Sequence, residues 1–275
     1  FRFRLGNFEC LAVLDTVDPM QLTDFFPHIP AAEIQNLSDR YRIPLASRFE
    51  IACLVVKTGR NTVLVDTGFQ PGMRPNSGML IPNLQAAGVP CSDIDTVILS
   101  HGHPDHIGGN VDSQLQPNFP SARYVINKKE WEFWASEPEL KKFNDSMRQE
   151  MLECARKNLL AIKDRVSVVT PGVDIMPGFQ YIDAPGHTPG QAAILVSSGT
   201  EQLIFVADIY HNVLQLAQPD WSSSLDLDPE KATETRKQIL HRAASTNILV
   251  FASHFPFPAI GRIVKQDAVH LWQPL

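Results

Sequence analysis

Four side chains that can bind a metal ion lie together in the motif His-Gly-His-Pro-Asp-His, directly after an apolar, β-branched run at 96–99. Such a run is typical of a buried strand, so the motif is predicted at a strand end. His101 and His103 are two residues apart, and in an extended segment their imidazoles leave the chain on the same side and can bind one ion. Asp105 and His106 follow a proline that ends the strand. We therefore expect their side chains to point elsewhere, toward a second ion.

The ligand types indicate which ions such a site would bind. Imidazole and carboxylate groups without a thiolate favour Zn²⁺, and they also accept Mn²⁺, Fe²⁺ or Co²⁺. The alternative is a chance cluster of histidines in a polar surface loop. The chain has only nine histidines in 275 residues, and three of them lie in this motif. We therefore prefer the metal site and expect two divalent ions, of which zinc fits best.

The motif His-x-His-x-Asp-His after an apolar strand resembles the signature of the metallo-β-lactamase superfamily. The resemblance covers most of the chain, from about Phe8 to its end. It implies an α/β fold, a four-layer αββα sandwich of two facing mixed sheets with outer helices, and metal ions at the edge where the sheets meet. Layered α/β folds often reach this length as one unit, and no linker-like composition interrupts the sequence. We therefore expect a single domain over residues 1–275.

The family pattern continues with a later histidine, an aspartate after a strand and a final histidine, and the chain has His187, Asp208 and His254 at matching places. Carried over by position, the resemblance implies two sets of ligands that share one bridging aspartate: His101, His103, His187 and Asp208 for one ion, and Asp105, His106, His254 and Asp208 for the other. An anionic carboxylate between two cations lowers their repulsion, which favours a binuclear site.

Asp66 ends another strand-like run, Val-Leu-Val-Asp-Thr-Gly, and resembles an outer carboxylate of the family rather than a metal ligand. In that role it accepts a hydrogen bond from a ligand histidine and thereby fixes the tautomer of the ring. The alternative is a carboxylate that only caps the turn before Gly68.

Two features of the motif favour hydrolysis over other reactions of the family. Members with cysteine or serine at the bridging position tend toward β-lactam chemistry, and redox members of the diiron kind have glutamate in place of His103. The resemblance implies a binuclear hydrolase, in which a hydroxide shared by two metal ions attacks a carbonyl carbon or a phosphorus centre. One metal would stabilise the developing oxyanion, and Asp105 or a bound water would carry the proton to the leaving oxygen. Thioester hydrolysis of the hydroxyacylglutathione type and iron-dependent oxidation on the same scaffold remain alternatives.

The segment 254–263, His-Phe-Pro-Phe-Pro-Ala-Ile-Gly-Arg-Ile, resembles the methyl parathion hydrolase branch of the family. That branch hydrolyses organophosphate triesters, lactones and aryl esters, so the expected substrate is a small neutral lactone, ester or phosphotriester. In N-acyl-homoserine lactonases, a tyrosine three residues after the bridging aspartate helps to hold the substrate carbonyl. Here His211 has that position and Tyr210 precedes it. His211 is therefore a candidate catalytic residue, which either donates to the oxyanion or orients neighbouring groups.

Six residues are candidates for the substrate pocket, because they follow predicted metal-edge strands or correspond to pocket walls of the family: Phe69, Met79, Leu80, Trp131, Tyr210 and Phe255. Met73 lies in the same loop as the first three and belongs with them. Phe255 and Phe257 are equally compatible with a rigid Phe-Pro-Phe-Pro connector whose rings lie in the core.

An apolar stripe at helical spacing follows the metal motif and consists of Leu140, Phe143, Met147, Met151 and Ala155, with charged residues on the other faces. A stripe of this kind is far more often part of a core than a ligand contact. We therefore expect a helix that packs on a sheet, and we do not assign Met147 or Met151 to the substrate.

The remaining pattern predicts strands followed by helices in each half of the chain, which fits two facing sheets with helices outside. The first strands are predicted as an antiparallel meander at 8–14, 48–57 and 61–66, and the second set at 166–169, 179–183, 192–198 and 202–207. Residues 17–47 are predicted as a long surface excursion that covers the pocket or a partner subunit, or as a plain loop. Helices are predicted at 83–87, 128–135 and 229–244.

Composition bears on partners and compartment. The formal net charge is -6 and no basic tract is present, so we expect no nucleic-acid partner. No apolar run approaches the roughly 20 residues of a membrane span, so we expect no membrane partner. Four scattered cysteines do not suggest a disulfide framework. We expect a soluble protein, compatible with a homodimer, and the sequence leaves a cytoplasmic or a periplasmic or secreted location open because a leader removed before Phe1 is compatible with it.

Overall fold

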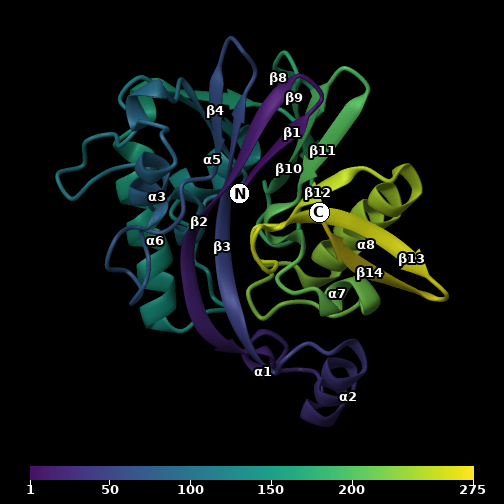
Figure 1. The fold of residues 1–275 in the computed structure, drawn as a ribbon. Coiled ribbons are helices and arrows are strands. Elements are labelled where there is room, and N and C mark those ends of the chain that lie inside the picture. The colour runs from purple at the N-terminus through teal and green to yellow at the C-terminus, as the bar shows by residue number, and fades with distance from the viewer.

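The computed structural model describes residues 1–275, apart from the side chain of Ser47, and consists of two facing seven-stranded sheets (Figure 1). The first sheet contains, in spatial order, β1 (Arg2–Leu5), β2 (Phe8–Gln21), β3 (Ala46–Lys57), β4 (Thr62–Val65), β5 (Thr96–Leu99), β6 (Arg123–Asn127) and β7 (Val166–Val169). The second contains β14 (Val269–Pro274), β13 (Ile260–Gln266), β12 (Leu249–Phe251), β11 (Glu201–Phe205), β10 (Ala192–Ser198), β9 (Phe179–Asp183) and β8 (Asp174–Met176).

Helices cover the outer faces of both sheets (Figure 1). The helices are α1 (Leu22–Phe25), α2 (Ala31–Tyr41), α3 (Leu80–Ala86), α4 (Pro104–Ile107), α5 (Lys128–Ala135), α6 (Asp145–Leu160), α7 (Leu214–Ala217) and α8 (Pro229–Thr246). Three short 3-10 turns are η1 (Cys91–Asp93), η2 (Lys163–Arg165) and η3 (Ala207–Ile209). Side chains of α3, α5 and α6 pack on the first sheet, and side chains of α8 pack on the second. The predicted four-layer αββα sandwich is therefore confirmed.

The core forms three layers, because successive side chains along a strand point to opposite faces of its sheet and so enter different layers. In β4, Val63 and Val65 point toward the second sheet, whereas Leu64 points toward the helices of the first. All four residues of β5 are buried, since both faces of this strand are covered. The apolar run that precedes the histidine motif is thus held rigidly on two sides, which fixes the start of the motif in space.

Both sheets are mixed. The first runs antiparallel from β1 to β4 and then parallel from β4 through β7. The prediction that 166–169 belongs to the second set of strands is wrong, because β7 pairs parallel with β6 in the first sheet. The reason is the intervening α5 and α6: a helical crossover returns the chain to the same sheet edge, which gives parallel pairing, and a strand pattern alone does not reveal it.

Residues 17–47 form part of an arm rather than a plain loop. β2 continues to Gln21 and β3 starts at Ala46, so the two strands extend as one long antiparallel pair, with α1 and α2 at its far end (Figure 1). Apolar residues of α1 and α2 pack with Phe49, Leu214 and Trp221. The arm is thus anchored by its own apolar cluster to a segment that follows Asp208.

Tyr181 links the two sheets directly below the histidine motif. It lies in β9 of the second sheet and is buried, and its hydroxyl donates to the carbonyl oxygens of Leu99, at 2.8 Å, and Val125, at 2.9 Å. Both acceptors belong to the first sheet, and Leu99 ends the strand that leads into the motif. A buried hydroxyl with two partners stabilises the spacing of the sheets at this point.

The change Tyr181→Phe should lower the free energy of unfolding by about 1–2 kcal/mol, because it removes the buried hydroxyl that bonds to both carbonyl oxygens. Urea denaturation of the metal-loaded protein measures the effect. The matched control is Tyr41→Phe on α2, a half-buried residue away from the sheets, which should change stability little. Equal stability of both variants and the unchanged protein would show that the link contributes nothing.

Candidate metal centre

The candidate ligands all lie just beyond the ends of strands. The motif follows β5, His187 follows β9, Asp208 lies in η3 after β11, and His254 follows β12. Because β4 and β5 run parallel, as do β11 and β12, their carboxyl ends meet at one edge of the facing sheets. Residues far apart in sequence are thereby brought into one buried cluster.

The motif divides its side chains through a change of backbone. His103 is still extended, with φ -75° and ψ 155°, and Pro104 then begins the short helix α4. Proline suits the first position of a helix, since its missing N–H would have no partner there. His101 and His103 therefore leave the extended segment together, whereas Asp105 and His106 leave from the helix toward a different point.

One group of ligand atoms contains His101, His103, His187 and Asp208. The Nδ1 of His103 lies 3.1 Å from Nε2 of His101 and 2.7 Å from Nε2 of His187. The Oδ2 of Asp208 lies 3.2 Å from Nε2 of His187 and 4.0 Å from Nε2 of His101. All four residues are buried.

The second group contains Asp105, His106, His254 and again Asp208. Here the other oxygen, Oδ1 of Asp208, lies 2.7 Å from Nε2 of His106 and 3.0 Å from Nε2 of His254. The Oδ2 of Asp105 lies 3.5 Å and 3.7 Å from the same two nitrogens. Asp208 thus faces one group with each of its oxygens, as a bridging ligand would.

These atoms fit divalent metal ions. Ligand atoms about 2.1 Å from one zinc ion lie about 3.4 Å apart at tetrahedral angles, and the distances of 2.7–4.0 Å in the first group span that value. Although Nε2 of His106 is close to Asp208, it has no well-directed hydrogen bond among the described residues. Converging nitrogens without donors between them are a poor arrangement unless a cation takes the lone pairs.

Outer partners fix the tautomers of three ligand rings. The Nδ1 of His106 lies 2.7 Å from Oδ2 of Asp66, and Asp66 also accepts from the backbone N–H and the hydroxyl of Ser100. The Nδ1 of His254 lies 3.1 Å from the backbone oxygen of Glu50. Because each Nδ1 faces an acceptor, it carries the proton, and the Nε2 lone pair points into the centre.

The third such partner is Asp226, which sequence reasoning missed as a part of the site. Its Oδ1 lies 3.0 Å from Nδ1 of His187, and its Oδ2 accepts from the backbone N–H of Ser223 and from the guanidinium of Arg236. Burial alone would raise the pKa of Asp226, but the bond from His187 and nearby positive charge lower it to about 2. In the sequence, its one distinguishing feature is that it precedes the start of α8, where a carboxylate favours the positive end of the helix dipole.

The pKa shifts differ between the residues of the centre: those of His101 and His103 are lowered by burial, whereas those of His106 and Asp208 are governed by neighbouring charges. Burial lowers the pKa of His101 and lowers that of His103 to about 3, so both rings are neutral and offer lone pairs. Burial acts on His106 in the same direction, but three neighbouring carboxylates, led by Asp208, outweigh it and raise the pKa. For Asp208, burial would raise the pKa, but the surrounding histidines hold it well below its usual range. The Asp208 carboxylate is therefore ionised.

His211 lies next to the centre rather than in its opening. The ring is fully buried, and its Nε2 lies 3.3 Å from Oδ2 of Asp208. It packs between the rings of Phe25, His187 and His254. Neither ring nitrogen has a hydrogen-bond partner among the described residues. Of the two roles considered, the position behind Asp208 favours orientation of the neighbouring groups over contact with a substrate.

A cavity of about 430 Å³ opens onto the two groups of ligands. His103, Asp105 and Asp208 reach it, and its apolar walls are Pro19, Met20, Phe49, Phe69, Pro75, Met147, Met151 and Leu225. Arg74 and Glu150 stand at its rim and are joined by two hydrogen bonds, of 3.1 Å and 2.5 Å. Phe69 is the one predicted pocket residue that lines this cavity. Met147 and Met151, which we had not assigned to the substrate, also line it.

Three other pocket predictions are wrong because the side chains lie in the core. Tyr210 and Phe255 are buried together behind the second sheet, and the Tyr210 hydroxyl donates to the backbone oxygen of Arg236. Leu80 begins α3 and packs on the first sheet. For Phe255, the alternative of a core ring in a rigid connector is the one observed. Phe257 is partly exposed instead.

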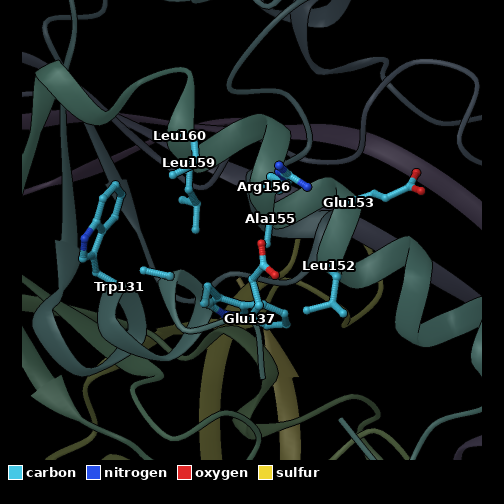
Figure 2. A pocket seen from close by; sticks show the side chains of 10 residues that line it. Trp131, Glu137, Leu152, Glu153, Ala155, Arg156, Leu159 and Leu160 are labelled. Atoms are coloured by element: carbon cyan, nitrogen blue, oxygen red, sulfur yellow. The ribbon is translucent and has the colours of Figure 1, made fainter. Parts of the chain in front are cut away.

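Two further pocket predictions place residues in the wrong part of the surface. Met79 is 44% exposed and does not line the cavity, because the turn before α3 carries it outward. Trp131 lines a separate cavity of about 230 Å³ between α5 and α6, where it faces Leu159 and Leu160 (Figure 2). Met73 packs between two apolar clusters near the first cavity.

Comparison with known proteins agrees with this geometry. The model of the metallo-β-lactamase superfamily matches residues 47–254. The structure of AidC, a dizinc quorum-quenching lactonase in complex with a product, N-hexanoyl-L-homoserine, has 31% sequence identity and a TM-score of 0.91, and the match covers 100% of this chain and 97% of that one. The hydrolase AbOPH of the β-lactamase superfamily has 27% identity and a TM-score of 0.92 over the same shares.

Curated relatives are more distant. An N-acyl homoserine lactonase of Bacillus cereus is 25% identical over 174 residues, which are 56% of this chain and 61% of that protein. A lactonase of Bacillus thuringiensis is 22% identical over 74% of this chain and 80% of its own length. The chain thus spans about three fifths of the first of these relatives.

No described helix has the length and apolar character needed to cross a membrane. Since the superfamily model spans most of the sequence and the ligand groups lie where its fold brings them together, the chain belongs to the metallo-β-lactamase superfamily.

Proposed function

We propose that this chain is a binuclear, metal-dependent hydrolase whose main substrates are lactones, with zinc as the best-fitting metal. The observation that carries the proposal is the position of Asp208, whose two oxygens each face a separate group of ligand atoms at the floor of an apolar cavity. The similarity to a dizinc lactonase at 31% identity over nearly the whole of both chains supports the same substrate class.

In this proposal, the metal ions have seven ligands. His101, His103 and His187 hold one ion, Asp105, His106 and His254 hold the other, and Asp208 bridges them. When bound, such ions supply a hydroxide nucleophile near neutral pH and a Lewis acid for the carbonyl oxygen. Asp66, Asp226 and the Glu50 carbonyl keep the Nδ1 protons of the ligand rings away from the centre.

The cavity walls determine which molecules reach the centre. Met20, Phe49, Met147, Met151 and Leu225 offer apolar surface, which suits a neutral acyl group and excludes water from it. The basic side chain at the rim, Arg74, is paired with Glu150, so it is not available to attract an anionic substrate. These walls favour a neutral lactone over a charged thioester such as a glutathione conjugate.

Asp105 is the candidate for proton transfer to the leaving oxygen. Both Asp105 and Asp208 line the cavity, but the side chain of Asp105 is 12% exposed and that of Asp208 only 2%. A carboxylate oxygen at the floor of the cavity is within reach of the group that leaves when the ester bond breaks.

Phosphotriesters are a second candidate class of substrate. Arg74, the basic residue of the lining, is paired with Glu150, which suits an uncharged phosphorus centre. The apolar walls suit aryl or alkyl leaving groups. Because the chemistry required of the centre is the same, only the walls discriminate between the two classes.

A parallel comparison of substrates tests the proposed function. The zinc-loaded protein should hydrolyse an N-acyl homoserine lactone with the highest kcat/KM, an aryl ester and a phosphotriester with lower values, and a glutathione thioester slowest. Removal of metal with a chelator should abolish all of these activities, and added zinc should restore them. Highest activity on the thioester, or iron-bound protein with oxygen-dependent turnover, would refute the proposal.

The bridging role of Asp208 is tested by Asp208→Asn, which keeps the volume of the side chain and removes its charge. We expect the metal content to fall from two ions toward one, and turnover to fall by orders of magnitude, because the repulsion between two cations is no longer offset. Elemental analysis and steady-state kinetics measure the two effects. A variant that keeps two ions and ordinary turnover would contradict the bridge.

The role of the apolar wall is tested by Met147→Glu on α6, at a position that is 36% exposed and lines the cavity. A charge in the wall should raise KM for a long-chain acyl lactone by about tenfold, equal to about 1.4 kcal/mol of binding. The matched control is Leu160→Glu on the same helix, which is 47% exposed and lies outside this cavity. An equal effect of the two changes would remove Met147 from the substrate wall.

A further inference from the structure

Glu130 is a buried carboxylate that the proposed chemistry does not use. It lies in the first turn of α5, is 0% exposed, and accepts four hydrogen bonds. Its Oε1 accepts from the backbone N–H of Gly102, at 2.8 Å, and from the indole of Trp134, at 2.7 Å. Its Oε2 accepts from the hydroxyl of Thr188, at 2.7 Å, and from the backbone N–H of Gly190, at 3.0 Å.

The four donors come from two loops and from the helix itself. Gly102 stands between His101 and His103, and Thr188 directly follows His187. One carboxylate oxygen therefore holds the loop that carries two ligands of the first group, and the other oxygen holds the loop that carries the third. Since a carboxylate is rigid and planar, it sets the distance between the two loops.

Neighbouring contacts tighten the same connection. The ring of Trp134 packs edge-on against the ring of His103, with centroids 5.7 Å apart. Asn127, which caps α5, donates from its side chain to the backbone oxygen of Gly190 at 2.6 Å. The N–H and the carbonyl of Gly190 are thus both bound at the start of this helix.

Two glycines make this approach possible. A Cβ at Gly102 would lie 2.2 Å from the indole nitrogen of Trp134, and a Cβ at Gly190 would lie 2.1 Å from the backbone nitrogen of Glu130. Both distances are far below any real contact, so a side chain at either position would push α5 away from the loops. The sequence therefore uses glycine at both points where the helix touches the ligand loops.

We infer that Glu130 is a positioning residue for the first metal ion, because it joins the His101–His103 loop to the His187 loop and so presets the spacing of three ligands. The second group has no such link to α5 among the described residues, since its rings are held by Asp66 and by the Glu50 carbonyl. The inference rests on the metal centre of the proposed function, but not on the identity of the substrate.

The consequence of losing the link follows from its charge and geometry. All four partners are donors, which an ionised carboxylate satisfies fully. The amide introduced by Glu130→Gln would offer one oxygen to one loop and an N–H₂ group toward the donors of the other. The affinity of the first site should then fall by about 10–100-fold, as expected when an outer partner of the ligands is removed, whereas the second site should change much less.

The test measures metal binding rather than turnover. Glu130→Gln and the control Glu132→Gln, an exposed residue of the same helix paired with Lys128, are loaded with zinc and titrated with a competing chelator. We expect Glu130→Gln to hold one ion at ordinary affinity and one weakly, and the control to hold two. Anomalous scattering at the zinc edge from crystals should show reduced occupancy at the site of His101, His103 and His187.

Two milder variants cover the case in which Glu130→Gln does not fold. Trp134→Phe removes one donor from Oε1, and Thr188→Val removes one from Oε2. Each should weaken zinc at the first site by a smaller factor and leave the affinity of the second site at the value of the control, which a general loss of stability would not do. If all variants hold two ions with unchanged affinity, or if both sites weaken equally, the inference is wrong. Absence of lactone hydrolysis by the unchanged protein would instead refute only the proposed function.

Discussion

The structure depends on one unfavourable arrangement, the burial of the ionised Asp208 among five imidazole rings. Each of its oxygens lies 2.7–3.3 Å from histidine nitrogens. Without metal ions, the neighbouring carboxylates raise the pKa of His106 and His254, so that protons on these two rings offset part of the buried negative charge. Burying an ion is costly unless an opposite charge lies beside it. The fold must therefore hold these groups together, and cations bound among them would take the place of the protons.

That requirement explains why the outer partners come from so many elements. Asp66 follows β4, Glu50 lies in β3, Asp226 precedes α8, and Glu130 belongs to α5. Each one binds a ligand ring or a ligand loop from a different direction, so the rings of His106, His187 and His254 do not rely on their own loops for their orientation. Asp66 adopts the left-handed region, with φ 60°, which orients its carboxylate toward both Ser100 and His106. Aspartate tolerates this conformation better than most residues do.

The sequence predicted the parts of the site that follow from local spacing. The strand at 96–99, the turn into a helix at Pro104 and the division of the motif between two ligand groups all depend on neighbours in the chain. Glu130 and Asp226 were not found, because each acts on a ligand loop 28 or more residues away and sits in a segment whose own pattern shows only a helix start. Likewise, the prediction of Tyr210 and Phe255 as pocket residues fails because the segments that carry them are turns, whose backbone directs both rings into the core behind the second sheet.

Met147 and Met151 show a limit of hydrophobic periodicity. Along α6, an apolar side chain has the same spacing whether it meets a sheet, a neighbouring helix or an open cavity. In the structure, the stripe meets both the core and a cavity. Met151 and Ala155 pack in the core, and Met147 and Met151 border the cavity. The walls of this cavity come mainly from α6, from the loop of Phe69 and from the arm of β2 and β3, with Leu225 from the loop before α8 and Pro104 from the motif itself. Because most walls lie on segments remote from the motif, the motif predicts the groups of candidate ligands far better than it predicts the walls of the cavity.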